Sequence, residues 1–170
     1  MTLILQNDSG SVSDANAYID VAFFKAYHES RGFIASNSDA DISTAIVRAT
    51  DYIDTRFNFI GYRAVYGQST QWPRSNAVNR DRGLESDIPL VVKRATAEYA
   101  KIALEQVLNP NPDRDGSGAA VLSRSESVGP LSESVRFAKA GVFEMPKYPL
   151  ADRLLINMGL VIRNNQIRRG

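Results

Sequence analysis

The sequence predicts a mainly α-helical fold: a small bundle of three or four helices with a long loop, a projecting β-hairpin and extended N- and C-terminal arms. Apolar residues recur every three or four positions over residues 38–57 and again over 89–107, as on the buried face of a helix. Residues 119–137 alternate with a period of two instead, as paired strands do. A chain of 170 residues can bury one substantial core, so we expect residues 1–170 to form a single domain.

Two helices are expected in the first third of the chain. Asp20 is placed to cap a helix that ends near Gly32, since a carboxylate accepts bonds from free helical N–H groups and glycine tolerates a left-handed backbone. Ser38 and Asp41 predict a start resembling a capping box for the next helix. Residues 1–19 should form an extended arm. The core-facing stripe of the second helix should comprise Ile42, Ile46, Ala49, Ile53 and Phe57.

The middle of the chain should contain a long loop and a third helix, so that residues 20–108 make up the helical core. No periodicity survives over residues 58–87, and loops of this length are usually functional or tightly pinned. Pro89 suits the first turn of a helix, and the sequence NPNPD from Asn109 must end it. The buried face of this helix should comprise Val92, Ala95, Tyr99, Ile102 and Val107.

A hairpin and a short helix should follow. Apolar residues stand at even separations on both sides of Gly129-Pro130, which predicts a hairpin over 119–137. Serines and charges fill the alternate positions, so we expect the hairpin to project from the body. Pro149 opens a last helix within the C-terminal region 149–170. The arginines of the final residues form a cationic tail, either a solubilising end or a segment that docks on an acidic partner or on DNA phosphate.

Composition narrows the class of protein. Hydrophobic residues make up 44% and charged residues 23%, as in soluble globular domains. The 20 Lys and Arg against 19 Asp and Glu leave a formal charge of +1, whereas a dedicated nucleic-acid binder usually carries a clear basic excess. The absence of cysteine excludes disulfides and thiol chemistry. We expect neither a signal peptide nor a membrane span, because no basic region precedes TLIL and every apolar run is short.

No set of residues predicts an enzyme. The only histidine, His28, falls late in the first predicted helix, where a helix-end or surface role outweighs catalysis. Residues 111–116 resemble the opening of a calcium-binding loop, but Leu122 stands where the closing glutamate ligand belongs. We therefore expect no catalytic residue, no metal site and no cofactor.

The segment QWPR has two interpretations. Trp72 is the only tryptophan, and Arg74, Arg80 and Arg82 follow it; an aromatic ring among arginines suits stacking on unpaired bases. A tryptophan beside a proline also suits burial that pins a long loop to a core, with its indole N–H satisfied locally. Acidic side chains in the same loop offset the arginines, so we favour a loop anchor made of Trp72, Pro73 and Arg74.

Several short segments occur in an order that resembles a known family. In chain order these are Ala15-Asn16-Ala17-Tyr18, Ala49-Thr50-Asp51-Tyr52-Ile53, Gln71-Trp72-Pro73-Arg74, Ile88-Pro89, Ala95-Thr96-Ala97-Glu98 and Val128-Gly129-Pro130-Leu131. No single segment is specific. Their order and spacing together resemble the head-to-tail connector, or adaptor, proteins of tailed bacteriophages, whose members have often been labelled DnaT-like single-stranded DNA-binding proteins. The resemblance covers most of the chain.

The resemblance implies a structural virion protein. Its copies would form a dodecameric ring in the virion neck, assembled in the host cytoplasm between the portal protein and the next neck or tail-completion protein. DNA would pass through the lumen without sequence recognition. The C-terminal region would dock on the portal, through Leu154, Leu155, Met158, Ile162, Arg163, Arg168 and Arg169. The hairpin would contact neighbouring subunits or the tail side, through Leu122, Arg124, Glu126, Val128, Leu131, Glu133 and Val135.

The alternative hypothesis is a single-stranded DNA-binding accessory protein of phage replication. Under this hypothesis Trp72, Tyr62, Tyr66 and the loop arginines should share one exposed face, because stacking on bases requires accessible rings.

Overall fold

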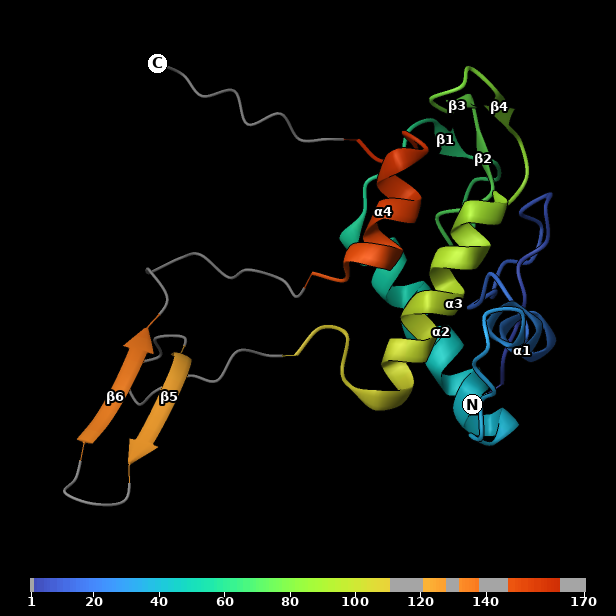
Figure 1. The fold of residues 1–170 in the computed structure, drawn as a ribbon. Coiled ribbons are helices and arrows are strands. Elements are labelled where there is room, and N and C mark those ends of the chain that lie inside the picture. The colour runs from blue at the N-terminus through green and yellow to red at the C-terminus, as the bar shows by residue number, and fades with distance from the viewer. Residues whose placement is uncertain (1, 111–120, 128–131, 138–146, 163–170) are drawn as a thin grey trace, which may run out of the picture. The chain divides into compact units, whose positions relative to one another are not determined.

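A computed structural model describes residues 2–110, 121–127, 132–137 and 147–162 (Figure 1). The fold is mainly helical, with helices α1 (Val21–Glu29), α2 (Asp39–Arg56), α3 (Leu90–Glu105) and α4 (Pro149–Asn157). Short strands form three antiparallel pairs, β1 with β2, β3 with β4 and β5 with β6. The chain divides into two compact units, one of Met1–Leu108 with Lys147–Gly170 and one of Asn109–Pro146. Within the described ranges, no helix is long and apolar enough to cross a lipid bilayer.

The first two helices begin at the predicted caps. The carboxylate of Asp20 accepts a hydrogen bond from the backbone N–H of Phe23 at 2.7 Å, and the hydroxyl of Ser38 accepts one from the N–H of Asp41 at 3.2 Å. Gly32 has a φ of +76°, in the left-handed region expected for it, although α1 itself ends at Glu29. Side-chain caps satisfy N–H groups that the first helical turn leaves free, so these residues fix where the helices start.

The core of the larger unit lies between α2 and α3, with α4 packed on α3 (Figure 1). All members of the predicted stripe of α2 are buried, and so are Val92, Ala95 and Tyr99 of α3. The prediction for Val107 is wrong: its side chain is 66% exposed because α3 ends at Glu105, two residues before it. Ile102 is half-buried and borders the groove between α3 and α4.

The N-terminal segment packs on the body more closely than the predicted extended arm. It contains little regular structure, only a parallel bridge between Leu5 and Ala17. Ala17, Tyr18 and Ile19 are nevertheless buried in the core. The amide of Gln6 also donates to the hydroxyl of Thr70, which ties the segment to the long loop.

The long loop at 58–87 carries four two-residue strands, at one end of the helices in Figure 1. They are β1 (Tyr62–Arg63), β2 (Arg74–Ser75), β3 (Ala77–Val78) and β4 (Leu84–Glu85). Gly61 is required at the start of β1, since it has a φ of +74° and a Cβ there would lie 2.4 Å from the carbonyl oxygen of Ser75. Strands this short produce no sequence pattern, so the loop was expected to be irregular throughout.

The predicted hairpin is present in the smaller unit. Strand β5 (Val121–Ser127) pairs antiparallel with β6 (Ser132–Phe137), with Arg124 opposite Val135 and Glu126 opposite Glu133. A register shift lies between Val121 and Ser123. The predicted turn at Gly129-Pro130 and the calcium-like segment 111–116 lie outside the described residues.

Candidate functional site

Trp72 lies in the core of the larger unit. Its side chain is 0% exposed, and its ring packs edge-on against Phe59 with the centroids 5.5 Å apart. The next residue, Pro73, is also buried, and the peptide bond between Trp72 and Pro73 is cis. The expected local partner for the indole N–H is not found: Nε1 of Trp72 is buried without a hydrogen bond among the described residues. A ring in this position cannot stack on a DNA base while the loop is folded.

Two polar side chains hold the backbone of the Trp72 loop. The hydroxyl of Tyr18 donates to the carboxylate of Asp54 at 2.5 Å and accepts from the backbone N–H of Trp72 at 3.1 Å. The other carboxylate oxygen of Asp54 accepts from the N–H of Gln71 at 2.9 Å. Burial raises the pKa of Asp54 from 3.8 to about 6, against the lowering effect of these two bonds. The loop is thereby tied to α2 and to the N-terminal segment.

The side chain of Arg74 forms its hydrogen bonds within the same loop. Its guanidinium donates to the carbonyl oxygens of Ile60 and Gly61, each at 2.7 Å, and of Phe59 at 3.2 Å. It also bonds to both the backbone and the side chain of Gln71. Burial, and then the positive charge of Arg63, lower the pKa of Arg74. These bonds leave the guanidinium buried and turned to its own backbone, so it is not available to a phosphate.

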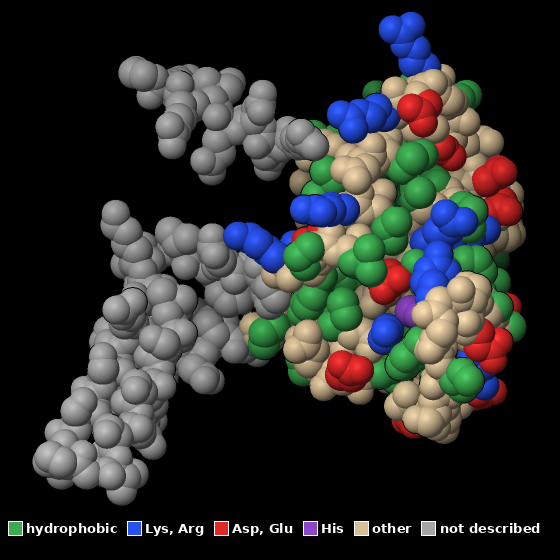
Figure 2. All heavy atoms as spheres, viewed as in Figure 1, with side chains coloured by type: hydrophobic (Ala, Val, Ile, Leu, Met, Phe, Trp, Pro, Cys, Tyr) green, Lys and Arg blue, Asp and Glu red, His purple; other side chains and the backbone are tan. Residues whose placement is uncertain are grey.

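The aromatic residues expected to share a face with Trp72 do not share it. Tyr62 is 72% exposed, and the ring of Tyr66 is fully exposed. Arg63, between them in sequence, is exposed as well. Figure 2 shows Lys and Arg side chains next to Asp and Glu side chains at the end of the larger unit where β1 to β4 lie. The accessible aromatic surface of the loop is therefore the segment 62–66, and Trp72 is separate from it.

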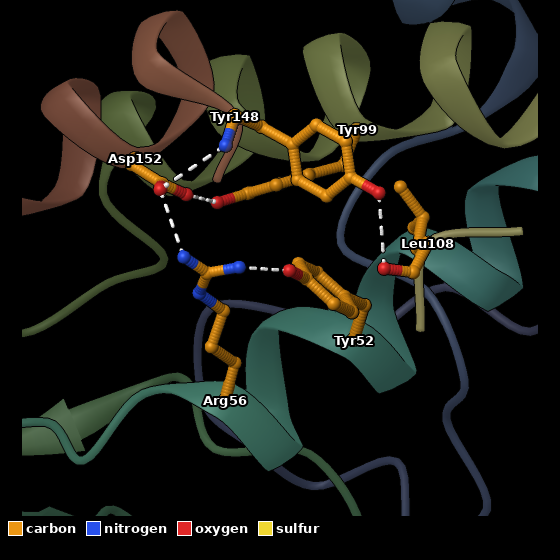
Figure 3. Close-up of polar contacts among 6 residues, drawn as sticks. All are labelled: Tyr52, Arg56, Tyr99, Leu108, Tyr148 and Asp152. Atoms are coloured by element: carbon orange, nitrogen blue, oxygen red, sulfur yellow. Dashed lines mark hydrogen bonds and ion pairs between the residues drawn. The ribbon is translucent and has the colours of Figure 1, made fainter. Parts of the chain in front are cut away.

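A buried polar cluster joins α2, α3 and α4 (Figure 3). Arg56 of α2 forms an ion pair of 2.9 Å with Asp152 of α4 and donates to the hydroxyl of Tyr52. The hydroxyl of Tyr99, on α3, donates to the other carboxylate oxygen of Asp152. Burial, and then this bond, raise the pKa of Tyr99 far above its usual range. Each helix contributes a partner, so the cluster fixes α4 against the other two.

The same cluster lies where the chain leaves and re-enters the larger unit. Tyr148 donates its hydroxyl to the carbonyl oxygen of Leu108 at 3.0 Å, and its backbone N–H donates to Asp152 at 3.3 Å (Figure 3). Its ring also packs edge-on against Tyr52 and Tyr99. Because residues 109–146 form the smaller unit, the bond between Tyr148 and Leu108 joins the two ends of that segment.

The residues predicted to dock on a portal differ in accessibility. Leu155 is fully buried, so its side chain is not available to a partner in this fold. Leu154 and Met158 are half-buried, and Ile162 is 50% exposed. Arg163, Arg168 and Arg169 lie outside the described residues. Of the described residues in this set, Leu154 and Met158 are partly accessible to a partner and Ile162 is exposed.

The residues predicted for the hairpin contact fall on both strands. Leu122, Arg124 and Glu126 belong to β5, and Glu133 and Val135 belong to β6. Val128 and Leu131 lie outside the described residues.

His28 is buried at the end of its helix, and its role there is structural. It lies in the last turn of α1, is 2% exposed, and its Nε2 is 3.0 Å from the carbonyl oxygen of Ala97 on α3. Burial lowers its pKa. This side chain docks α1 on α3.

Sequence reasoning missed the Tyr18–Asp54 pair and the Arg56–Asp152 pair. Arg56 lies outside the apolar stripe of its helix and is nevertheless half-buried. The partners are 36 and 96 residues apart in the chain, so no local spacing signals either pair.

The fold and the loop define a small, mainly helical protein in which one tryptophan-centred loop is pinned to the helices and an inserted hairpin follows the third helix. The whole chain, residues 1–170, matches the family described as "Putative DnaT-like ssDNA binding protein", and the protein belongs to that family. No curated protein and no solved structure matches it.

Proposed function

We propose that the chain binds single-stranded DNA, and that Tyr62, Arg63 and Tyr66 make the contacts in place of Trp72. The observation that carries this proposal is the exposure of two tyrosine rings within one short loop segment, on either side of an exposed arginine. Every base presents a π-face, so stacking of this kind needs no particular sequence. The description of the family supports the same function.

The size of the surface sets the affinity to expect. Base–aromatic stacking contributes about 1–3 kcal/mol per base, so two rings favour a short, weakly held strand. Arg63, Arg80 and Arg82 are exposed in the same loop and could each meet a phosphate. Three such contacts on a single strand would give a slope of about −2 for log K against log salt. A formal net charge of +1 makes a steeper salt dependence unexpected.

The test is titration of the purified protein into a fluorescently labelled oligothymidine, read by anisotropy. The double variant Tyr62→Ala/Tyr66→Ala should bind at least about tenfold more weakly, because both stacking rings are gone. The matched control Tyr62→Phe/Tyr66→Phe keeps both rings and should bind within about twofold of the wild type. Equal binding by the alanine variant, or no binding by the wild type, would refute this function.

A second candidate function is the head-to-tail adaptor of a tailed phage, as the order of the short sequence segments suggests. One structural observation favours it: among the described residues, β5 pairs only with β6. An isolated two-stranded hairpin is marginally stable in water, and its outer edges can accept further strands. A subunit of a ring would obtain such neighbours from adjacent copies, and the resemblance implies a dodecamer that contacts the portal and the next neck or tail-completion protein.

The adaptor candidate is tested by mass spectrometry of purified virions, with this chain quantified against the portal protein. A ratio near one to one is expected of a neck ring matched to the portal. Absence from particles, with the protein abundant in infected cells, would leave DNA binding as the surviving candidate.

A further inference from the structure

A groove of about 270 Å³ lies between the second half of α3 and the start of α4. Glu98, Lys101, Ile102 and Glu105 form its α3 side, at the spacing that places residues on one face of a helix. The α4 side is residues 148–151, of which Leu150 is 63% exposed. Figure 2 shows hydrophobic side chains gathered on the face shared by α3 and α4. The groove thus has an apolar floor and carboxylates at its edge.

The residues that line the groove carry more negative than positive charge, with two glutamates and one lysine. Neither Glu98 nor Glu105 forms an ion pair within the part of the chain that the structure describes. One oxygen of Glu98 accepts a hydrogen bond from the hydroxyl of Tyr27 at 2.8 Å, and this neutral donor does not cancel the negative charge of the carboxylate. The only cation of the lining, Lys101, has its ammonium 4.0 Å from the ring centroid of Phe33. That ammonium lies over an aromatic ring and forms no ion pair with either carboxylate among the described residues.

Glu105 also lies at an unfavourable end of its helix. It is the last residue of α3, where the helix dipole is negative, and the last turn contains no basic residue. A carboxylate there is disfavoured, whereas an arginine or lysine is stabilised by the dipole and by the free carbonyl groups. A cation from outside the described residues would satisfy both the helix end and Glu105.

We propose that this groove binds the C-terminal segment of a second copy of the chain. Residues 163–170, RNNQIRRG, contain three arginines and no acidic side chain, with Ile167 among them. The isoleucine suits the apolar floor, and the arginines suit Glu98 and Glu105 through charge-assisted hydrogen bonds. The segment therefore matches the groove in both charge and hydrophobic content.

The position of Ile162 favours a second copy over the same chain. Its backbone N–H donates to the carbonyl oxygen of Asn58 at 2.7 Å, just before β1, whereas the groove lies at the start of α4. To reach its own groove, the segment would have to turn back along the whole of α4. Transfer to another copy needs no reversal and produces a head-to-tail contact, which repeats around a ring or along a filament. The proposal goes beyond DNA binding and does not depend on it.

The first test measures the contact directly with a fluorescein-labelled peptide of residues 161–170. The receptor is the full chain with Arg163→Glu, Arg168→Glu and Arg169→Glu, which keeps the groove but cannot offer its own tail. Saturable binding is expected, and adding Glu98→Gln and Glu105→Gln should weaken it about tenfold, as expected for two surface ion pairs. A peptide that does not bind, or that binds both receptors equally, overturns the proposal and leaves the groove to another protein.

The second test establishes whose tail is bound. The tail variant and the groove variant Glu98→Gln/Glu105→Gln are mixed and examined by sedimentation velocity. Each alone should be a monomer, while the mixture should form a one-to-one dimer, since one copy has an intact groove and the other an intact tail. Peptide binding without dimer formation in the mixture would show that a tail attached to one copy cannot enter the groove of another, which overturns the second-copy proposal. Far-UV circular dichroism checks that both variants are folded.

Discussion

Replacement of Trp72 by alanine should lower the free energy of unfolding by about 3–5 kcal/mol, the usual cost of truncating a fully buried large aromatic side chain. The indole is 0% exposed and packs on Phe59, so truncation removes its core contacts and leaves a cavity under the loop. The variant Trp72→Phe should cost less. It keeps an aromatic ring and removes the buried Nε1–H, whose lack of a partner costs about 1–3 kcal/mol in the wild type.

Urea denaturation followed by far-UV circular dichroism measures both variants, because the change removes the only tryptophan and with it the fluorescence signal. The matched control is Tyr66→Ala in the same loop, whose fully exposed ring should change stability by no more than about 0.5 kcal/mol. If Trp72→Ala stays folded with wild-type stability, the loop is not anchored by this side chain. Loss of oligonucleotide binding in such a folded variant would return Trp72 to the DNA interface.

Three further predictions concern the polar groups that hold the loop and the helices. Arg74→Lys should lose about 2–3 kcal/mol in urea denaturation, because an ammonium cannot reproduce the fork of bonds to several carbonyls. Burial raises the pKa of Asp54 from 3.8 to about 6, so the folded state favours the protonated carboxyl. The contribution of Asp54 to stability is therefore greatest below pH 4 and is lost as the pH rises through 6. That loss amounts to about 3 kcal/mol and should be missing from the pH profile of Asp54→Asn. Asp152→Ala should cost about 3–5 kcal/mol by removing the carboxylate that pairs with Arg56 and accepts from Tyr99, and the double variant Arg56→Met/Asp152→Ala should recover part of this in thermal melts.

The helices were predictable because their signals are local. The caps at Asp20 and Ser38 and the stripe from Ile42 to Phe57 depend on residues within a few positions of one another. The predicted end of α3 was a few residues too late. The helix-breaking sequence begins only after Leu108, and Val107 continued the apolar spacing, whereas the helix ends at Glu105. Patterns of this kind give the existence of an element more reliably than its last turn.

The polar contacts of the loop were not predictable, because their partners come from distant parts of the chain. The hydroxyl of Tyr18 meets Asp54, and both meet the backbone before Trp72, although nothing in the spacing of these residues indicates it. The division between buried Trp72 and exposed Tyr62 and Tyr66 is likewise a matter of packing, since all three occur in one aperiodic stretch. Composition could suggest an aromatic surface but could not say which rings form it.

The bond between Tyr148 and Leu108 has a consequence for how this chain can change. A segment whose two ends meet at one point can be lengthened, shortened or exchanged without moving the helices that hold those ends. The 109–146 segment is in this sense a replaceable module on a constant frame. Relatives could therefore acquire different partners by altering this segment alone, and a short glycine-serine bridge from Leu108 to Lys147 should yield a minimal, folded frame for engineering.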